Sequence, residues 1–548
     1  MGRANDQEEP RKEAGDAVTQ HSNRYGEAAI SRPSGSGIPE GIRQTVDDLF
    51  DTWTSVRARN ARLTRYYEMR NQIRDFGIAV PPNLKHVDEV VGWAQKAVDV
   101  RVNRSMFDGF VFRGKSDEDL DALVSHNRMR QLVRRATRSM LTHGCSAITV
   151  MRGGDGQPAA KVRSFSANQC CMLWDKDADG IGAGVVLADV DRDGNASRYV
   201  VHMPDRVTVL RRDYGTLSWY VESDEDNPVG SMLMVPLAND ADDDKPLGHP
   251  VLTPELTSIV DKAVRDVLRM DVGAEFFTTP QRWATGIAAG LFGKPLKDED
   301  GNPVIDEDTG EPVLVTDEAK KLRAYLGSLW LFSKDEDGDS PKLGQFPAGD
   351  AKNFIATYEN DAQRFSGASL VPLAQLGVMG NTYTSSDALS ASNDPLILDV
   401  QCINDGLKDS LWQVARLMMA VSGGLRLDQL TDRQNGVMAS FRDPSMPTMA
   451  SRADAWSKLG ALDSSIVGTR VFYEGVGLDQ ATIDRLEAEK RDAQSESILS
   501  SIFTSAKSFQ GGDERAQETG DGAQSAQGEP NAQDTAAAGQ GAPAGVGE

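Results

Sequence analysis

The chain has 548 residues, of which 39% are hydrophobic and 26% are charged, a composition typical of globular proteins with several domains. No apolar run approaches the roughly 20 residues needed to cross a bilayer, and the polar N-terminus has no signal-peptide core, so we expect neither a membrane protein nor a secreted one. The net charge of −23 argues against a uniformly basic, nucleic-acid-gripping surface.

The acidity is local. Residues 41–140 hold 18 Lys or Arg against 13 Asp or Glu, a balance of +5, whereas residues 213–245 hold nine acids against one Lys. Residues 291–320 and the tail from 492 hold nine acids each, against three and two basic residues. Because each neutralised phosphate adds affinity for DNA and therefore drag, this distribution suits a protein past which DNA slides.

The cysteines and histidines show no catalytic or metal-binding pattern. Cys145, Cys170, Cys171 and Cys402 lack metal-ligand spacing, and adjacent Cys170 and Cys171 do not easily bridge each other, so we expect reduced thiols in a cytosol. The six histidines form no H-E-x-x-H motif, and no G-x-S-x-G elbow occurs. We therefore predict no metal, no cofactor and no active site.

In chain order, the first elements are helical. Residues 1–43 are polar and rich in Gly, Ser and Pro, which predicts a disordered arm with order beginning near Gln44. Val46–Met69 has the spacing of one or two amphipathic helices, and 87–102 resumes the pattern. One helix is predicted over 117–142, with Ser116 as its N-cap.

The middle of the chain predicts an antiparallel sheet and then a long helix. Short β-prone runs separated by Gly and Asp turns predict an α+β domain, with strands at 147–151, 161–165, 171–174, 185–190, 198–202 and 206–210. Thr253-Pro254-Glu255 predicts a helix start, and the apolar stripe from Leu256 to Leu268 continues until Pro280. Residues 283–347 form an acidic, turn-rich segment with strands predicted at 312–315 and 329–332.

Two further helices flank a Gly-rich loop. The first begins at 350 and ends near Ser366, and the apolar loop that follows runs to Thr384. Thr384-Ser385-Ser386-Asp387 predicts the start of a second helix, which continues to Ala420 with a kink at Asp394-Pro395 and ends at Gly423-Gly424. A strand at 436–440, helices at 451–459 and 478–493, and a disordered acidic tail complete the prediction.

Two motifs have a functional and a structural interpretation. Gly109–Ser116 matches the phosphate-loop pattern G-x-x-x-x-G-K-S, but residues 98–107 before it have helical period, and Phe110 and Val111 favour extended strand over a phosphate cradle. Asp175–Gly180 and Asp189–Gly194 resemble the start of a calcium loop, but Val186 and Val200 stand where the bidentate Glu belongs. A strand before a helix cap, and acidic hairpin turns, are the favoured interpretations.

The ordered series of residues resembles the portal proteins of tailed bacteriophages, most of all the type common in long-tailed phages of actinobacteria. The resemblance covers roughly 45–490 and rests on the whole series rather than on one motif. The matching residues are Tyr66-Tyr67, Val91-Gly92-Trp93, Val98-Asp99, Gly109-Phe110, Asn127, His143-Gly144, Gly377–Leu389, Asn393–Trp412, Phe441-Arg442-Asp443-Pro444 and Ala453–Leu459.

The resemblance implies a mainly helical α+β portal fold with an antiparallel wing, two stem helices, a β-containing clip and a long kinked helix. Its division of this chain would be a disordered arm (1–43), wing (44–250), first stem helix (251–282), clip (283–347), second stem helix (348–370), tunnel loop (371–384), long kinked helix (385–424), wing return and helical crown (425–495), and disordered acidic tail (496–548).

The resemblance also implies a function without catalysis. Like other portals, the chain would form a homododecameric ring at the capsid vertex of the virion, assembled in the host cytoplasm. Double-stranded DNA would pass through it without sequence recognition, and its protein partners would be the terminase large subunit, a head–tail connector, and the major capsid and scaffolding proteins. The site residues implied are the loop Gly377, Val378, Met379, Gly380, Asn381, Thr382, Tyr383 and Thr384, with Lys262, Arg265, Arg269 and Lys352 as candidate tunnel-wall charges.

Each candidate tunnel-wall charge could equally serve a salt bridge between subunits.

Two functions compete with that of a portal. A nucleotide-hydrolysing enzyme would use Gly109–Ser116, and loss of turnover in a Lys115→Ala variant would favour it. An adaptor without a channel is the third candidate, which the two long helices flanking a β insertion disfavour.

Overall fold

A computed structural model describes residues 26–34, 37–70, 89–112, 117–213, 215–278, 282–285, 293–298, 300–306, 312–316, 342–345, 352–378, 391–447, 449–478 and 482–495. The chain divides into two compact units, residues 1–446 and 447–548. The predicted α+β class is confirmed. Among the described residues, no helix is both long enough and apolar enough to span a membrane.

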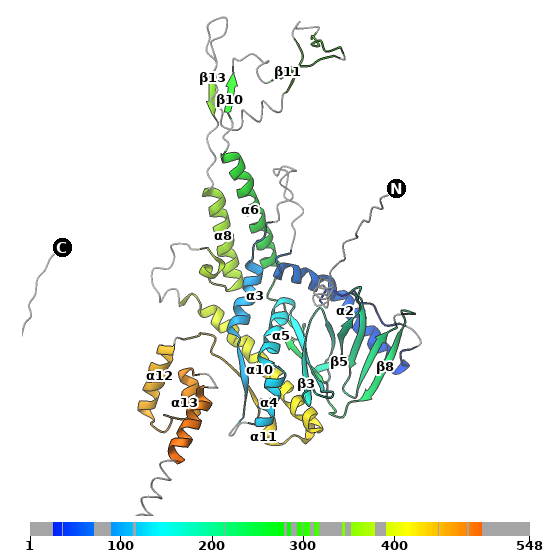
Figure 1. The fold of residues 1–548 in the computed structure, drawn as a ribbon, viewed down its shortest axis with the longest axis vertical. Helices are drawn as coiled ribbons and strands as arrows, with labels where there is room; N and C mark the ends of the chain where they lie inside the picture. Colours follow the sequence, from blue (N-terminus) through cyan, green and yellow to red (C-terminus); the bar gives the residue numbers. More distant parts are fainter. Residues whose placement is uncertain are drawn as a thin grey trace, which may run out of the picture. The chain divides into compact units, whose positions relative to one another are not determined.

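A long amphipathic helix, α2 (Glu40–Tyr67), covers a five-stranded antiparallel sheet (Figure 1). The strands follow chain order: β4 (Cys170–Asp175), β5 (Gly180–Val190), β6 (Ala196–His202), β7 (Arg206–Arg212) and β8 (Trp219–Asp226). Phe50 and Trp53 of α2 meet Tyr199 of the sheet, with ring centroids 4.9 and 6.0 Å apart. Burying these aromatic faces fixes the helix on the sheet.

The N-terminal arm joins this core earlier than predicted. Ala28 and Ile38 are each 3% exposed within the α2–sheet cluster, and Ala29 pairs with Asn195 as an isolated parallel bridge. The prediction of disorder up to 43 is therefore wrong for 26–34 and 37–43, because two apolar side chains there find a place in the core. Residues 1–25 and the predicted acidic tail from 496 lie outside the described residues.

A second, three-stranded antiparallel sheet has β2 (Cys145–Arg152) at its centre, between β3 (Ala160–Ser166) and β9 (Met234–Ala238). Its residues Ala147, Ile148 and Val150 are fully buried, because helices α5 (Met129–His143) and α10 (Asp394–Gly423) both pack against the sheet. The six predicted strands between 147 and 210 are confirmed, but they belong to two sheets rather than one. Strands β8 and β9 were not predicted from the sequence.

The helix predicted over 117–142 is two helices, α4 (Glu118–His126) and α5 (Met129–His143), and the prediction of one is wrong. Between them, Arg128 adopts a left-handed conformation with φ 51°. The side chain of Asn127 donates to the Ala160 carbonyl at 2.9 Å and accepts from the Val162 amide at 2.9 Å. The break lets one amide side chain bond the edge of β3 twice, which a continuous helix would not allow.

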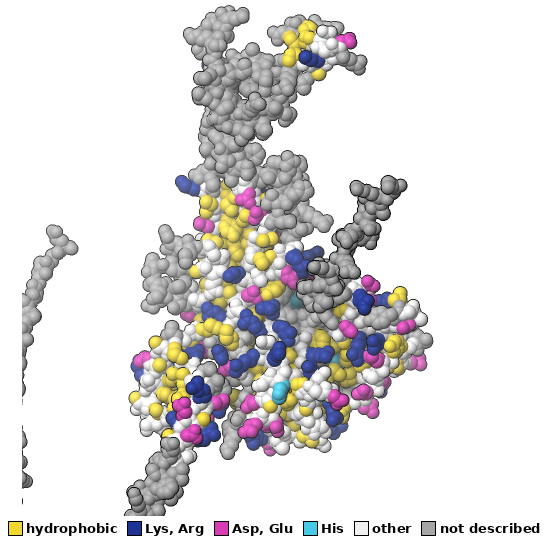
Figure 2. Space-filling model, viewed as in Figure 1, with side chains coloured by type: hydrophobic (Ala, Val, Ile, Leu, Met, Phe, Trp, Pro, Cys, Tyr) yellow, Lys and Arg dark blue, Asp and Glu magenta, His cyan; other side chains and the backbone are white. Residues whose placement is uncertain are grey.

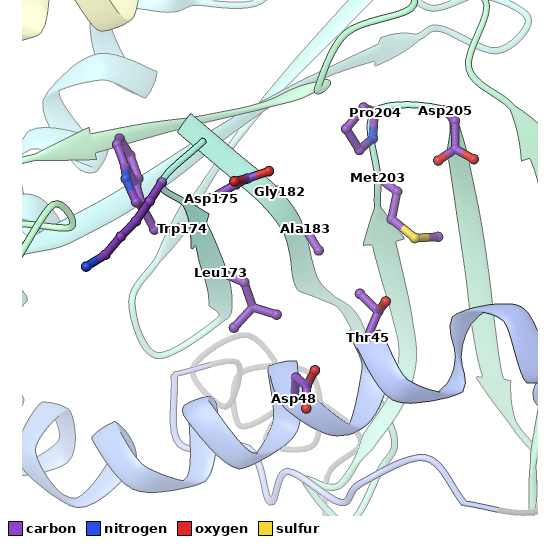
Figure 3. Close-up of a pocket in the computed structure, with 11 residues that line it drawn as sticks. Thr45, Asp48, Leu173, Trp174, Asp175, Gly182, Ala183, Met203, Pro204 and Asp205 are labelled. Carbon is purple, nitrogen blue, oxygen red and sulfur yellow. The ribbon is translucent and has the colours of Figure 1, made fainter. Parts of the chain in front are cut away.

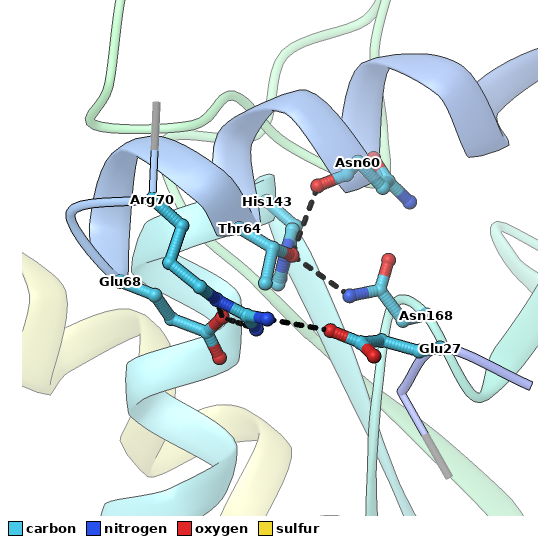
Figure 4. A network of polar contacts seen from close by, with 7 residues as sticks. All are labelled: Glu27, Asn60, Thr64, Glu68, Arg70, His143 and Asn168. Atoms are coloured by element: carbon cyan, nitrogen blue, oxygen red, sulfur yellow. Dashed lines mark hydrogen bonds and ion pairs between the residues drawn. The ribbon is translucent and has the colours of Figure 1, made fainter. Parts of the chain in front are cut away.

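A polar network at the end of α2 joins three elements (Figure 4). The Thr64 hydroxyl lies 2.9 Å from Nε2 of His143, at the end of α5, and accepts from Nδ2 of Asn168 at 2.9 Å. Arg70 pairs with Glu68 and, at 2.9 Å, with Glu27 of the arm. These contacts connect α2 to α5 and to the β3–β4 turn.

Two long helices lie side by side, α6 (Pro254–Thr278) and α8 (Lys352–Ser369) (Figure 1). As predicted, Thr253 caps α6, accepting from the Leu256 amide at 3.3 Å. Two small antiparallel pairs lie between them in the chain: β10 (Arg282–Thr285) with β13 (Lys342–Gln345), and β11 (Gly293–Pro295) with β12 (Leu314–Thr316). The strand predicted at 329–332 lies outside the described residues.

After the 3₁₀ turn η3 (Leu373–Leu376), the long helix α10 runs from Asp394 to Gly423 and ends at Gly424, which is left-handed with φ 62°. Pro395 occupies its first turn, where a missing N–H leaves no bond broken. Most of the helix predicted before this proline, residues 385–390, lies outside the described residues, so the kink stays a prediction. The capping box predicted at 384–387 lies outside the described residues.

Short elements complete the two units. η4 (Leu427–Gln429) and α11 (Asp432–Asn435) lead to β14 (Met438–Phe441), which confirms the predicted strand and pairs antiparallel with β1 (Phe107–Val111). Helix α3 (Trp93–Arg104) precedes β1. The second unit contains α12 (Met449–Leu462), α13 (Arg470–Val476) and a helical stretch at 482–495, of which α13 was not predicted.

Candidate functional site

The α6–α8 pair contains a buried ionic network that joins the two helices. Asp361 of α8 is fully buried, and its Oδ1 lies 2.5 Å from Nζ of Lys262 on α6. Asp266, one turn further along α6 and 3% exposed at its side chain, lies 3.5 Å from Lys262 and 2.9 Å from Arg269. Among the described residues, the Oδ2 atom of each of these two carboxylates has no hydrogen-bond partner. The two cations therefore compensate buried negative charge.

Two of the four predicted tunnel-wall charges belong to this network. Lys262 and Arg269 both make ion pairs within their own chain. Arg265 is half-buried on α6, and Lys352 is exposed at the first residue of α8. The structure thus brings Lys262 and Arg269 together around Asp266, whereas Arg265 and Lys352 are not part of the network.

A second polar cluster lies where α8 ends and α10 begins. Arg101 of α3 is 4% exposed, and its Nε lies 2.6 Å from Oδ2 of Asp399 on α10. Its other nitrogens donate to the carbonyls of Ser369, the last residue of α8, at 2.8 Å and of Ala97 at 2.7 Å. One buried guanidinium thus holds the end of α8 and the start of α10 on α3.

Arg104, one turn after Arg101, extends the cluster. It donates to Oδ1 of Asn393 at 3.0 Å and to the Pro444 carbonyl at 2.9 Å. Gln375 of η3 donates to the same Asn393 oxygen at 3.0 Å. We call Arg101, Arg104, Gln375 and Asn393 the α3 anchor, because they fix the chain on both sides of 379–390.

The predicted tunnel loop is only partly described. Gly377 is left-handed with φ 84°, a conformation that favours glycine, and Val378 packs against the main core. Met379, Gly380, Asn381, Thr382, Tyr383 and Thr384 lie outside the described residues.

Sequence reasoning missed the α3 anchor, although one signal was present. Arg101 follows Ala94, Ala97 and Val98 on the buried side of α3, where a charged side chain requires a partner. An arginine inside an apolar row is a feature that sequence inspection can find. Its partners, Asp399 and Ser369, are 298 and 268 residues away in the chain, and no local pattern identifies them.

The described part of the phosphate-loop motif does not support nucleotide binding. Its strand β1 pairs antiparallel with β14, whereas a working phosphate loop follows a buried parallel strand. Residues 113–116 lie outside the described residues. The helix that follows is capped by Asp117 rather than by the predicted Ser116, and places Glu118 and Asp119 in its first turn, where they would repel phosphate.

The calcium-like segments are hairpin turns, as favoured above. Oδ1 of Asp175 accepts from the amide of Asp177 at 2.9 Å, and Oδ1 of Asp191 accepts from the amides of Asp193 and Asn195 at 2.9 and 2.7 Å. These carboxylates thus stabilise their own turns. Across the part of the chain that the structure describes, no three His, Cys, Asp or Glu side chains are grouped to hold a metal ion.

An open hollow of about 430 Å³ lies between the start of α2 and one end of the five-stranded sheet (Figure 3). Thr45 and Asp48 of α2 face Leu173, Met203 and Asp205 of the sheet across it. Its three carboxylates, Asp48, Asp175 and Asp205, are all exposed to solvent, and neither His nor Cys is among its lining residues. This hollow has no arrangement of groups that would support catalysis.

Two curated relatives are portal proteins of mycobacteriophages. The chain is 25% identical over 434 residues to the portal protein of Mycobacterium phage L5, which covers 77% of this chain and 82% of that protein. It is 27% identical over 413 residues to the portal protein of Mycobacterium phage D29, with 72% and 78% covered.

Among solved structures, the chain aligns with one from the virion of a native gene transfer agent particle, at 12% identity and a TM-score of 0.36, covering 77% of this chain and 93% of that one. It also aligns with a chain from the neck of the native particle, at 13% identity and a TM-score of 0.35, with 71% and 90% covered.

The family model described as phage portal protein, SPP1 Gp6-like, matches residues 47–496. This match confirms the resemblance seen in the sequence. It includes α6, α8, α10 and both antiparallel sheets, so it applies to the elements that carry the ionic network and the α3 anchor. The chain belongs to the family of phage portal proteins.

Proposed function

We propose that this chain forms a closed ring, a homododecamer, at one vertex of a phage capsid, and that double-stranded DNA enters and leaves through its bore. Membership of the portal family over 47–496 carries the proposal. The paired helices α6 and α8, with strand pairs between them and α10 after them, supply the elements that such a conduit needs.

The domain roles follow the portal pattern. The wing would be 44–250, α6 and α8 would belong to the stem helices at 251–282 and 348–370, and 283–347 would be the clip. Residues 371–384 would be the tunnel loop, 385–424 the long helix and 425–495 the wing return and crown. The observed helices fall within the two stem ranges, since α6 spans Pro254–Thr278 and α8 spans Lys352–Ser369, which supports this division.

Passage of DNA requires weak contact with phosphate. In this proposal the bore carries few uncompensated cations, since Lys262 and Arg269 already pair with Asp361 and Asp266. A cation that pairs with an acid of its own chain does not neutralise a DNA phosphate. Fewer counterions are then released on binding, so the duplex binds less tightly and experiences less drag. Gly377–Thr384 would follow the backbone without reading bases, and Arg265 and Lys352 remain candidate wall charges.

The remaining partners follow from the position of such a ring. The terminase large subunit would dock during packaging and supply nucleotide hydrolysis, so the ring itself would have no enzymatic activity. A head–tail connector would bind later, and contacts with major capsid and scaffolding proteins would hold the ring at its vertex. Assembly would take place in the host cytoplasm, and the finished protein would be part of the virion.

Deleting Gly380–Tyr383 in the phage tests the proposal. These residues follow the anchored start of the loop, so we expect rings and capsids to form while DNA per capsid falls at least tenfold, because the duplex loses its inner guide. DNA content by quantitative PCR of purified capsids is the measurement. Lys176→Ser, in the exposed β4–β5 turn, is the control. Normal DNA content in the deletion variant would contradict the assignment of the loop.

A further inference from the structure

Helix α5 presents a basic surface on a strongly acidic chain. Its fifteen residues contain four arginines, Arg130, Arg134, Arg135 and Arg138, and no acidic residue. Three of the four are exposed and Arg138 is half-buried. Figure 2 shows Lys and Arg side chains gathered over α3 and α5. We call these four arginines the basic row.

Intrachain contacts hold the basic row in place without neutralising it. Arg130 lies 3.0 Å from Asp108, and Arg138 lies 3.6 Å from Asp99. Arg134 donates to the amide oxygen of Asn103, which carries no charge. Arg135 makes no ion pair with any residue of the described ranges. Two acids therefore face four guanidinium groups, and the surface keeps a positive surplus.

The first half of α10 has the opposite character. Residues 394–409 contain four Asp and one Lys, a balance of −3. Leu398 is 62% exposed and Cys402 is exposed, and their spacing with Asp405 and Asp409 places all four on one side of the helix. Asp405 pairs with Lys408 at 2.7 Å, whereas Asp409 makes no ion pair within the described ranges. We call Leu398, Cys402, Asp405 and Asp409 the α10 row.

We infer that the basic row of one copy faces the α10 row of the neighbouring copy in the ring. The inference rests on the proposed function, because a ring built by rotation joins two different faces of the same chain. Opposite charges on the two rows would fix the register of the contact. A second copy accounts for more of these features than duplex DNA would, since its basic row would pair with the acids of the α10 row and the contact would bury the exposed Leu398.

A cross-link between the two rows tests the contact directly. Cys402 is exposed, whereas Cys170 and Cys171 are buried, and burial raises the pKa of the half-buried Cys145 thiol to about 11, which lowers its reactive thiolate fraction. Gln131→Cys adds a thiol beside the basic row without changing its charge. A short bis-maleimide should then join the assembled copies into a ladder of dimers, trimers and larger species.

The controls separate this contact from random cross-linking. Lys176→Cys, in the exposed β4–β5 turn, should give no ladder, and Cys402→Ser should abolish the ladder of the Gln131→Cys variant. Rings seen by native mass spectrometry without a ladder would overturn the inference and leave the proposed function standing. If the unaltered chain forms no ring, the proposed function fails and the inference fails with it.

A charge swap provides an independent test. Arg135→Asp and Asp409→Arg each alter a residue that makes no ion pair with any other described residue, so they change mainly the contact between copies. We expect each single variant to weaken association roughly fivefold per interface, and the double variant to return within about twofold of the original. Equal assembly in all four proteins would overturn the inference. So would an Arg135→Asp variant that assembles normally but no longer retains a short duplex DNA, because the face would then belong to DNA.

Discussion

At the scale of single residues, His202 stands out because it is fully buried in β6 and neither ring nitrogen has a hydrogen-bond partner among the described residues. Burial lowers the pKa of His202 from 6.5 to about 4. Between these values the unfolded chain binds a proton that the folded chain does not. Stability is therefore present above pH 6.5 and is lost as the pH falls toward 4, by up to about 3 kcal/mol from this residue.

His202→Leu should remove that loss and, because it also removes two unpaired polar atoms, raise the free energy of unfolding at neutral pH by about 1 kcal/mol. Urea unfolding at pH 7.5 and pH 5 measures both effects. His143 is the matched control, since its pKa is also lowered to about 4 but its ring nitrogens contact Thr64 and Ser139. His143→Leu should destabilise the protein at pH 7.5. An acid sensitivity unchanged by His202→Leu would refute this explanation.

Single residues also show what sequence reasoning can recover. The capping role of Thr253, the helix end at Gly423-Gly424 and the acidic hairpin turns depend on neighbours within a few positions, and these predictions are confirmed. Arg101 and Asp361 depend on partners far along the chain, so local patterns identified neither as part of a cluster.

At the scale of elements, the α6–α8 pair depends on the ion pair between Lys262 and Asp361. Lys262→Met should cost about 3 kcal/mol of unfolding free energy, because it removes the close cation partner of a fully buried carboxylate and leaves only the more distant Arg364. Adding Asp361→Leu should recover much of the loss, since the double variant buries no unpaired charge there. A double-mutant cycle by denaturant unfolding measures the coupling.

The control for that cycle is Arg364→Met, because Arg364 lies 3.8 Å from Asp361 but is 53% exposed at its side chain. Solvent screens such a pair, so we expect a loss below about 1 kcal/mol. If the Lys262 and Asp361 substitutions prove additive, the two residues do not stabilise each other and the helices are joined by apolar packing alone.

Some helices and strands could be predicted from local sequence, whereas others depend on tertiary contacts. The apolar stripes of α2 and α6 were strong enough to predict both helices. The break after α4 was missed, because only the edge of β3 gives Asn127 its two partners. β8 was missed because its acidic residues resemble a loop in sequence, while Arg198, Arg206 and Arg211 pair with them in the structure.

At the scale of the whole molecule, family membership was recognisable from the ordered series of residues, and the match over 47–496 confirms it. Contacts between copies are a different matter. They depend on surfaces such as the basic row and the α10 row, whose exposure becomes visible only in the folded chain. Hydrophobic periodicity predicts which faces are buried within one copy, but it does not predict which exposed faces contact another copy.

The central claim is that copies of this chain close into a ring around a passage for DNA. Native mass spectrometry of the purified full-length chain tests it most directly, because the mass counts the copies in one particle. We predict a single dominant species at twelve times the chain mass of 59.4 kDa. A monomer or dimer as the only species, across protein concentration and salt, would contradict the claim.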